Sequence, residues 1–267
     1  KILFIGDIVG RSGREALAKY LPDVINRHKP DITIVNGENA AHGSGLTPKI
    51  VRNIYELGAD VVTTGNHVWG QKEIMTIIDS DKTLLRPVNL PRSNPGRGFT
   101  VVKTDAGKSV LVVNALARVF MDPVNCPFEA MDDILSQYQL GQSVDAIFLD
   151  FHGEASSEKM AMGHYLDGRV SAVVGTHTHV PTADCMIFPK GTGYMTDAGM
   201  TGDYNGVIGV KKDVPLQRFT TKITTKRMSP SDGEGSMCGV LVTVHDTTGL
   251  ATAIDPIRQG PNLSTAG

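Results

Sequence analysis

Five short apolar runs, each ending in a side chain that can bind a metal ion, constrain the fold more than any other feature of the sequence. The runs cover residues 2–5, 32–35, 61–64, 146–151 and 173–176. Segments with apolar residues at helical spacing separate most of them, and this alternation is typical of α/β proteins. The runs before residue 64 are nearly continuous in Val and Ile, as in parallel strands covered on both faces. The sequence therefore predicts an α/β fold that contains parallel strands.

The expected elements divide the chain into a βα part and a β-rich part. Helices are predicted at 14–29, with Pro22 kinking or breaking it, and at 47–57, 71–78, 127–140 and 154–166. Strands are predicted at 1–5, 31–35, 60–64, 84–90, 99–103, 109–114, 145–151, 170–174, 185–188, 193–196, 218–224 and 238–245. Thr47 and Pro48 form a typical helix start. This order of elements predicts two packed sheets with helices outside.

The polar residues that follow the five runs form the candidate site. They are Asp7, Glu38 with Asn39, Asn66 with His67, His152, and His177 with His179. Ligands of open α/β sheets bind outside the carboxyl ends of the strands, so these side chains are expected to meet at one edge. Gly6, Gly37, Gly65 and Gly175 come just before them and permit a sharp turn or a close approach of the backbone.

Each of these residues also has a structural interpretation when it is taken alone. Asp7 could cap a helix, Asn66 could form a turn and His152 could be a buried structural histidine. His177 and His179 are a stronger signal, because residues i and i+2 of an extended chain lie on one face. Capping and turn formation do not explain why the whole set falls at strand ends, and we interpret it as a metal site.

Composition excludes several classes of function. A net charge of −2 over 267 residues gives no electrostatic footprint for duplex nucleic acid or an anionic membrane. The three cysteines, widely spaced and without a C-x-x-C pair, argue against a disulfide framework and a thiolate zinc site. Neither a signal peptide nor an apolar run of 18 residues is present, so we expect a cytoplasmic protein. A homo-oligomer stays open, since no interface signature is found.

Several sequence blocks resemble the motifs of the calcineurin-like metallophosphoesterases, and more closely those of the bacterial YmdB-like branch. These blocks are Phe4–Gly10, Asn36–Ala40, Gly65–His67, Asp150–Glu154 with Ser157–Lys159, and Gly175–His179. The resemblance implies a four-layer sandwich, in which two packed mixed β-sheets are flanked by helices, as one domain over residues 1–267. It also implies a 2′,3′-cyclic-nucleotide 2′-phosphodiesterase, with 3′,5′-cyclic nucleotides as a further candidate substrate.

The same resemblance implies two metal ions that share the carboxylate of Glu38. One would be held by Asp7, Glu38, Asn39 and His179, and the other by Glu38, Asn66, His152 and His177. The broader superfamily has Asp-x-His in its first loop, where this chain has Asp7-Ile8-Val9, and Asn39 would replace the missing histidine. Iron is the expected metal, with Mn or Zn as alternatives. A hydroxide between the ions would attack phosphorus, and His67 would be the general acid. The alternative for His67 is that it only orients the site.

Three other functions were weighed. A phosphomonoesterase would use the same metals, and a regulator would bind metal or nucleotide with little turnover. A nicotinamide-linked oxidoreductase is disfavoured because the glycine fingerprint is missing.

Three further features have structural interpretations. Ser12 is expected to cap a helix, and Glu154 and Glu158 to lie on a solvated helix face. The stretch from Gly199 to Gly206 was expected to be either a substrate-facing rim or a surface loop.

Overall fold

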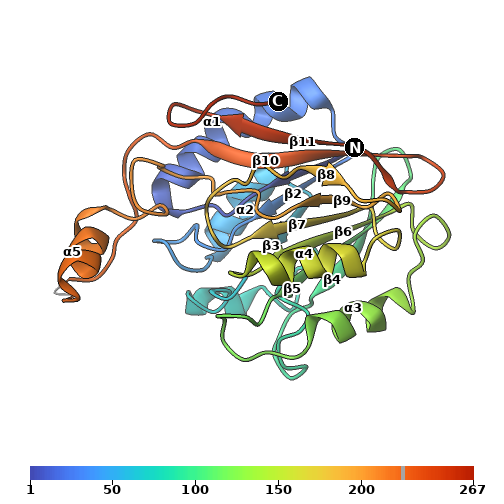
Figure 1. The fold of residues 1–267 in the computed structure, drawn as a ribbon, viewed down its shortest axis with the longest axis horizontal. Coiled ribbons are helices and arrows are strands. Elements are labelled where there is room, and N and C mark those ends of the chain that lie inside the picture. Colours follow the sequence, from blue (N-terminus) through green and yellow to red (C-terminus); the bar gives the residue numbers. More distant parts are fainter. Residues whose placement is uncertain (224–225) are drawn as a thin grey trace.

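Two mixed β-sheets pack face to face and helices cover their outer faces (Figure 1). The computed structural model describes residues 1–223 and 226–267. The first sheet has the strand order β11-β10-β1-β2-β3, and the second has the order β4-β5-β6-β7-β9-β8. The strands are β1 (Ile2–Ile5), β2 (Ile32–Asn36), β3 (Val61–Thr63), β4 (Phe99–Lys103), β5 (Ser109–Leu116), β6 (Ala146–His152), β7 (Ala172–Thr176), β8 (Met186–Ile187), β9 (Gly193–Met195), β10 (Met237–Val244) and β11 (Ala251–Gln259). The helices are α1 (Gly10–His28), α2 (Pro48–Glu56), η1 (Lys72–Thr76), α3 (Pro127–Leu135), α4 (Ser156–Tyr165) and α5 (Asp213–Thr221). The predicted fold class is confirmed.

Parallel pairing aligns the strand ends that carry the candidate site. In the first sheet β1 pairs with β2 and β2 with β3, both in parallel, as the Val- and Ile-rich runs predicted. In the second sheet β5, β6 and β7 are parallel neighbours. The carboxyl ends of β1, β2 and β3 therefore lie along one edge, and so do those of β6 and β7.

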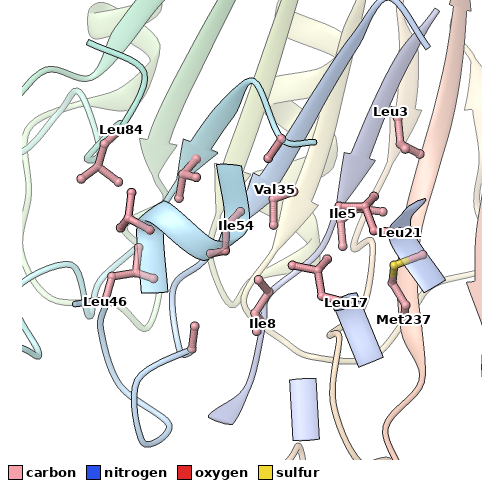
Figure 2. Close-up of a cluster of buried hydrophobic side chains, with 14 of the residues drawn as sticks. Leu3, Ile5, Ile8, Leu17, Leu21, Val35, Leu46, Ile54, Leu84 and Met237 are labelled. Carbon is pink, nitrogen blue, oxygen red and sulfur yellow. The ribbon is translucent and has the colours of Figure 1, made fainter. Parts of the chain in front are cut away.

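Three apolar clusters hold the layers together. The cluster in Figure 2 fills the space between the first sheet and its helices, where Leu17 and Leu21 of α1 pack near Leu3 and Ile5 of β1. The second cluster lies between the sheets, where the rings of Phe4 and Phe148 are 5.1 Å apart. The third packs α3 and α4 on the other face of the second sheet. Each fully buried side chain of this size stabilises the fold by about 1.5–3 kcal/mol.

The first helix differs from the sequence prediction at its start. It begins at Gly10 rather than at residue 14, and it continues through Pro22. Ser12 does not cap it, because this side chain lies inside the helix and donates its hydroxyl hydrogen to the carbonyl of Gly233 at 2.6 Å. The start of α2 is as predicted, since the hydroxyl of Thr47 accepts from the backbone N–H of Ile50.

The predicted strand at 218–224 is wrong over the part that the structure describes, and Thr224 lies outside the described residues. Helix α5 occupies this region, and Figure 1 shows it standing away from the two sheets, so no strand edge is available for pairing. The strand predicted at 84–90 is also wrong. Leu84 and Leu85 form single bridges, with Val62 and Arg97, and Pro87 lacks the N–H that a longer ladder needs.

Three predicted helices differ in extent. The segment predicted at 71–78 is a short 3-10 helix, the helix predicted at 127–140 ends at Leu135, and the one predicted at 154–166 begins at Ser156. No helix within the described ranges combines the length and the apolar character that crossing a bilayer requires.

Candidate metal centre

All seven predicted ligands lie at the edge where the parallel strands end. Four come from the first sheet, in the loops after β1, β2 and β3, and three come from the second sheet. The first four are Asp7, Glu38, Asn39 and Asn66, and the other three are His152, His177 and His179.

The other three residues of the second proposed ligand set surround the Nε2 atom of His152. Asn66 Oδ1 lies 2.9 Å from it, His177 Nδ1 lies 3.1 Å away and Glu38 Oε1 lies 3.6 Å away. Donor atoms bound at 2.0–2.2 Å to one ion are roughly 3–3.6 Å from each other, so these spacings match a coordination shell. In the described part of the chain no three His, Cys, Asp or Glu side chains already surround one ion position.

The first proposed ligand set contains polar atoms that are buried and have no hydrogen-bond partner. They are Asp7 Oδ1, Glu38 Oε2 and Asn39 Oδ1. A buried acceptor without a partner costs about 1–3 kcal/mol, and a cation bound by these three oxygen atoms would remove that cost. His179 Nε2 lies 3.2 Å from the side-chain amide of Asn39. The donor set therefore fits a hard or borderline metal ion.

Burial sets the protonation of the site. It raises the pKa of Asp7 to about 7, with a further contribution from Asp197, and it raises that of Glu38 well above its usual value. Burial also lowers the pKa of His177 to about 4 and that of His152 well below its usual range. The histidines are therefore neutral and able to bind a metal, while the carboxylates lack a counter-charge that a cation would supply.

Each proposed histidine ligand is held through its other ring nitrogen. His152 Nδ1 lies 3.0 Å from the hydroxyl of Thr176, which donates to Asp150 at 2.7 Å. His179 Nδ1 lies 2.8 Å from the carbonyl of Ile208. Such contacts fix the ring orientation and leave one nitrogen of each ring for a metal.

Glu154 holds the third ring. It is exposed, as the sequence analysis expected, but it precedes helix α4 rather than lying on a face of it. Its Oε2 lies 3.3 Å from His177 Nε2, and it lines the cleft beside the ligands. The solvated face predicted for Glu158 is wrong, because this buried carboxylate accepts hydrogen bonds from the backbone N–H groups of Arg118 and Val119. Helical spacing alone could not reveal these two contacts with distant loops.

The buried Asp150 was also missed as part of the site. It accepts hydrogen bonds from Asn36, Thr63 and Thr176, and burial raises its pKa to about 7. A signal was present in the sequence, because Asp150 interrupts an apolar strand two residues before His152 and so shares its face. A carboxylate inside a buried strand is rarely found without a polar role.

The loop with His177 and His179 has an unusual backbone that buried charges hold in place. The two residues have φ angles of 100° and 65°, in the left-handed region. Asp197 accepts from the N–H of Thr178 at 3.0 Å and from Lys159 Nζ at 2.8 Å. Both side chains of this ion pair are buried, and their hydrogen bonds hold the loop in place.

Glycine is required before two of the ligands because the backbone is crowded there. A Cβ atom on Gly175 would lie 1.8 Å from the carbonyl oxygen of Thr196. A Cβ atom on Gly65 would lie 2.4 Å from His152 Nε2. Close approach, rather than a sharp turn, explains glycine at these positions.

A cleft of about 330 Å³ opens onto the ligands. His67 lines it and is exposed, whereas His177, Thr178 and His179, which also line it, are partly buried. Burial of the ring and the nearby His179 lower the pKa of His67, and Asp122 opposes them. The backbone N–H of His67 donates to Glu38 Oε1 at 2.6 Å. His67 is therefore tied to a proposed ligand while its ring stays free in the cleft.

The stretch from Gly199 to Gly206, considered from the sequence as a substrate-facing rim or a surface loop, reaches the surface only at its end, residues 204–206. Residues 199–203 are buried, and Thr201 forms a bridge with Ile8 beside β1. The side chains that line the cleft come from the following residues, Ile208 and Val210.

We expect Glu154→Gln to weaken metal binding by about 10–100-fold, because His177 loses a charged partner that fixes its ring. Titration of the metal-stripped protein with Mn²⁺ measures this effect. Glu73→Gln, an exposed carboxylate on η1, is the matched control. An unchanged affinity in the Glu154 variant would contradict the orienting role.

The two facing sheets, with their helices outside and polar loops at the shared edge, define a metallophosphoesterase fold. Within that class the chain belongs to the YmdB-like family, whose model, described as "YmdB-like protein", matches residues 3–257.

Named relatives and solved structures support this assignment. The chain is 46% identical over 257 residues to a Bacillus subtilis protein named 2′,3′-cyclic-nucleotide 2′-phosphodiesterase, and the match covers 96% of each. A Mycoplasma pneumoniae protein named putative phosphatase/phosphodiesterase is 36% identical over 82% of this chain and 79% of its own. A crystal structure of a hypothetical protein from Thermus thermophilus has a TM-score of 0.90 at 41% identity, covering 97% of this chain and 98% of the other. A crystal structure of a novel phosphatase from Mycoplasma pneumoniae also has a TM-score of 0.90, at 32% identity, covering 97% and 92%.

Proposed function

We propose that this chain is a two-metal phosphodiesterase that hydrolyses 2′,3′-cyclic nucleotides at the strand-end site, within a single domain over residues 1–267. The observation that carries the proposal is the set of three buried, unpartnered oxygen atoms beside three neutral histidines. A cation bound there would satisfy all three oxygen atoms, and the cleft gives a phosphate ester access to it.

The proposed ligand sets share Glu38. Asp7, Glu38, Asn39 and His179 would hold one ion, and Glu38, Asn66, His152 and His177 the other. Iron is the proposed metal, with Mn or Zn as alternatives, because imidazole and carboxylate ligands suit all three. When bound, such a pair of ions activates a water molecule and neutralises the charge of the phosphate.

His67 is proposed as the general acid. Its ring lies in the cleft beside the ligands, where it can donate a proton to the oxygen that leaves phosphorus. Its lowered pKa favours the neutral ring, and two anions oppose this: the carboxylate of Asp122 and the phosphate of the substrate.

The proposed substrate class follows the printed name of the Bacillus subtilis relative, which covers nearly the whole chain. Cleavage of the bond to the 2′ oxygen would leave a 3′-phosphate. A 3′,5′-cyclic nucleotide is the second candidate substrate. A phosphomonoesterase on the same site has support from the word phosphatase in the names of two relatives. A regulatory protein with little turnover would not need the free ring of His67. The three cysteines are free thiols, which suits the proposed cytoplasmic location.

An assay of metal-loaded protein on four compounds tests the proposal. We expect Mn²⁺-dependent turnover of 2′,3′-cyclic AMP and bis(4-nitrophenyl) phosphate, with 4-nitrophenyl phosphate and 3′,5′-cyclic AMP turned over at least about tenfold more slowly, a difference of about 1.4 kcal/mol in the barrier. Faster hydrolysis of the monoester would favour the phosphatase. No turnover of any compound, with both metals bound, would favour the regulator.

A further inference from the structure

A second cavity, larger than the cleft at the metal centre, lies on another part of the molecule. Its volume is about 640 Å³, compared with about 330 Å³ for the cleft, and the two share no lining residue. The loop before β4, the start of β4 and the helix α3 form its walls. This volume is in the range of pockets that bind small organic molecules.

Two arginines that line this cavity lack an acidic partner. Arg86 is 6% exposed, and its guanidinium group donates to three backbone carbonyls, those of Pro87, Asn94 and Pro95. Arg97 makes no side-chain hydrogen bond or ion pair with any residue that the structure describes, and its Nε is buried without a partner. Neither side chain lies within 4 Å of a carboxylate in the described ranges. Arg86 is buried with Asp79 as a more distant counter-charge, and Arg97 is partly buried, so an anion in the cavity would offset part of the cost of burying these charges.

Asp79 is the acidic residue whose charge acts on Arg86, but it forms no ion pair with it, and its Oδ1 accepts from the backbone N–H of Gly96. The acidic residues that line the cavity do not pair with Arg86 or Arg97 either. Asp133 lies 3.6 Å from Arg92, and both of these side chains are largely exposed. Glu129 is exposed as well. Arg86 and Arg97 therefore keep two positive charges available to an occupant. The guanidinium group of Arg86 has five N–H donors, of which three are used, and that of Arg97 has all five free.

The remaining walls are mixed, with Asn89, Asn125 and Gln137 among the polar residues and an apolar part that suits an occupant with an apolar body. Val88, Leu90, Phe99 and Ile134 line the cavity together with the arginines. A phosphate monoester carries a charge of about −1.5 to −2 at neutral pH, which matches two guanidinium groups better than a carboxylate does. We propose that this cavity is a second binding site, separate from the metal centre, for a small organic phosphate with a flat apolar body such as a nucleoside monophosphate.

Cys126 gives a readout of this site that does not depend on catalysis. Its thiol lines the cavity and is partly exposed, whereas the partly exposed Cys185 lies outside it. The test is the rate at which N-ethylmaleimide labels each cysteine in the metal-loaded protein, followed by peptide mass spectrometry. With adenosine 3′-monophosphate at about four times its Kd, labelling of Cys126 is expected to slow about fivefold, with Cys185 unchanged.

Substitution of Arg97 links the protection to the proposed site. Arg97→Glu should abolish the protection, and this variant should fold because the Arg97 side chain makes no hydrogen bond. Arg52→Glu, the same change at an exposed position on α2, should keep it. Turnover should be unchanged in both variants, so failure here leaves the proposed function intact.

Three results would overturn the second site. They are no protection by adenosine 3′-monophosphate, equal protection by neutral adenosine, or protection that persists in Arg97→Glu. If Cys126 does not react in the free protein, titration calorimetry tests the second site by counting the molecules of adenosine 3′-monophosphate bound to each chain. Two molecules of probe should bind each wild-type chain and one should bind each Arg97→Glu chain, and equal numbers would reject the proposal.

Discussion

His67→Ala is expected to lower the kcat for 2′,3′-cyclic AMP by about 10²–10⁴-fold, while the metal content stays that of the wild-type protein. The ring of His67 lies in the cleft, and only its backbone N–H contacts a proposed ligand, Glu38. Alanine keeps that N–H, so the ligand should stay in place when the ring is removed. Steady-state kinetics and elemental analysis of the same preparation measure both effects.

The choice of leaving group separates a general acid from a residue that only orients the site. A nitrophenolate leaves without a proton, whereas the 2′ oxygen of a ribose needs one. His67→Ala should therefore lose much less activity on bis(4-nitrophenyl) phosphate than on the cyclic nucleotide. His42→Ala, at an exposed histidine outside both ligand sets, is the control. Equal losses on the two substrates would remove the acid role, and loss of metal would make His67 a ligand.

The sequence predicted the placement of the site because strand ends are local features. A run of apolar residues fixes where a strand stops, and parallel pairing then brings every strand end to one edge. The residues at Asp7, Glu38 and His152 could be placed in this way without knowing any contact between the two sheets.

The contacts that support the ligands could not be predicted in the same way. Thr176 meets His152 because β6 and β7 are neighbours, and Glu154 meets His177 across two loops. Both depend on three-dimensional proximity, which periodicity does not encode. Asp150 is the exception, since an acidic residue inside an apolar run is visible in the sequence.

The errors in the fold have a related cause. Arg218 to Thr221 combines β-branched and aromatic residues, which favours a strand, but β-propensity acts only where a neighbouring strand is available. This segment stands away from both sheets and forms α5 instead (Figure 1). Leu84 and Leu85 do have neighbours, but Pro87 ends the pairing after two bridges.

Glu38→Gln is expected to have opposite effects on metal binding and on the stability of the metal-free protein. Glu38 is fully buried, its Oε2 has no partner, and it is the proposed bridging ligand. Loss of its charge should lower metal affinity by more than about 100-fold, beyond the effect of changing an outer contact, and turnover should fall with the metal content. Elemental analysis after dialysis measures the first effect.

In the metal-free protein the same substitution should be stabilising at neutral pH. Burial raises the pKa of Glu38 well above its usual value of 4.5, so the folded state holds a proton that the unfolded state has released. Stability contributed by that proton is lost as the pH rises above 4.5, and glutamine cannot titrate. We therefore expect Glu38→Gln to unfold about 2–4 °C above wild type in chelator at pH 7.5, with a smaller difference at pH 5, as follows from about 1 kcal/mol in a chain of this size.

Scanning calorimetry with and without Mn²⁺ measures the unfolding temperature of Glu38→Gln relative to wild type in both states. Metal should reverse the order, because it binds the folded wild-type protein and stabilises it by mass action. Glu56→Gln, an exposed carboxylate at the end of α2, should follow wild type throughout. If Glu38→Gln kept full metal content, or unfolded below wild type in chelator at pH 7.5, Glu38 would be a structural residue and the shared-ligand arrangement would have to be abandoned.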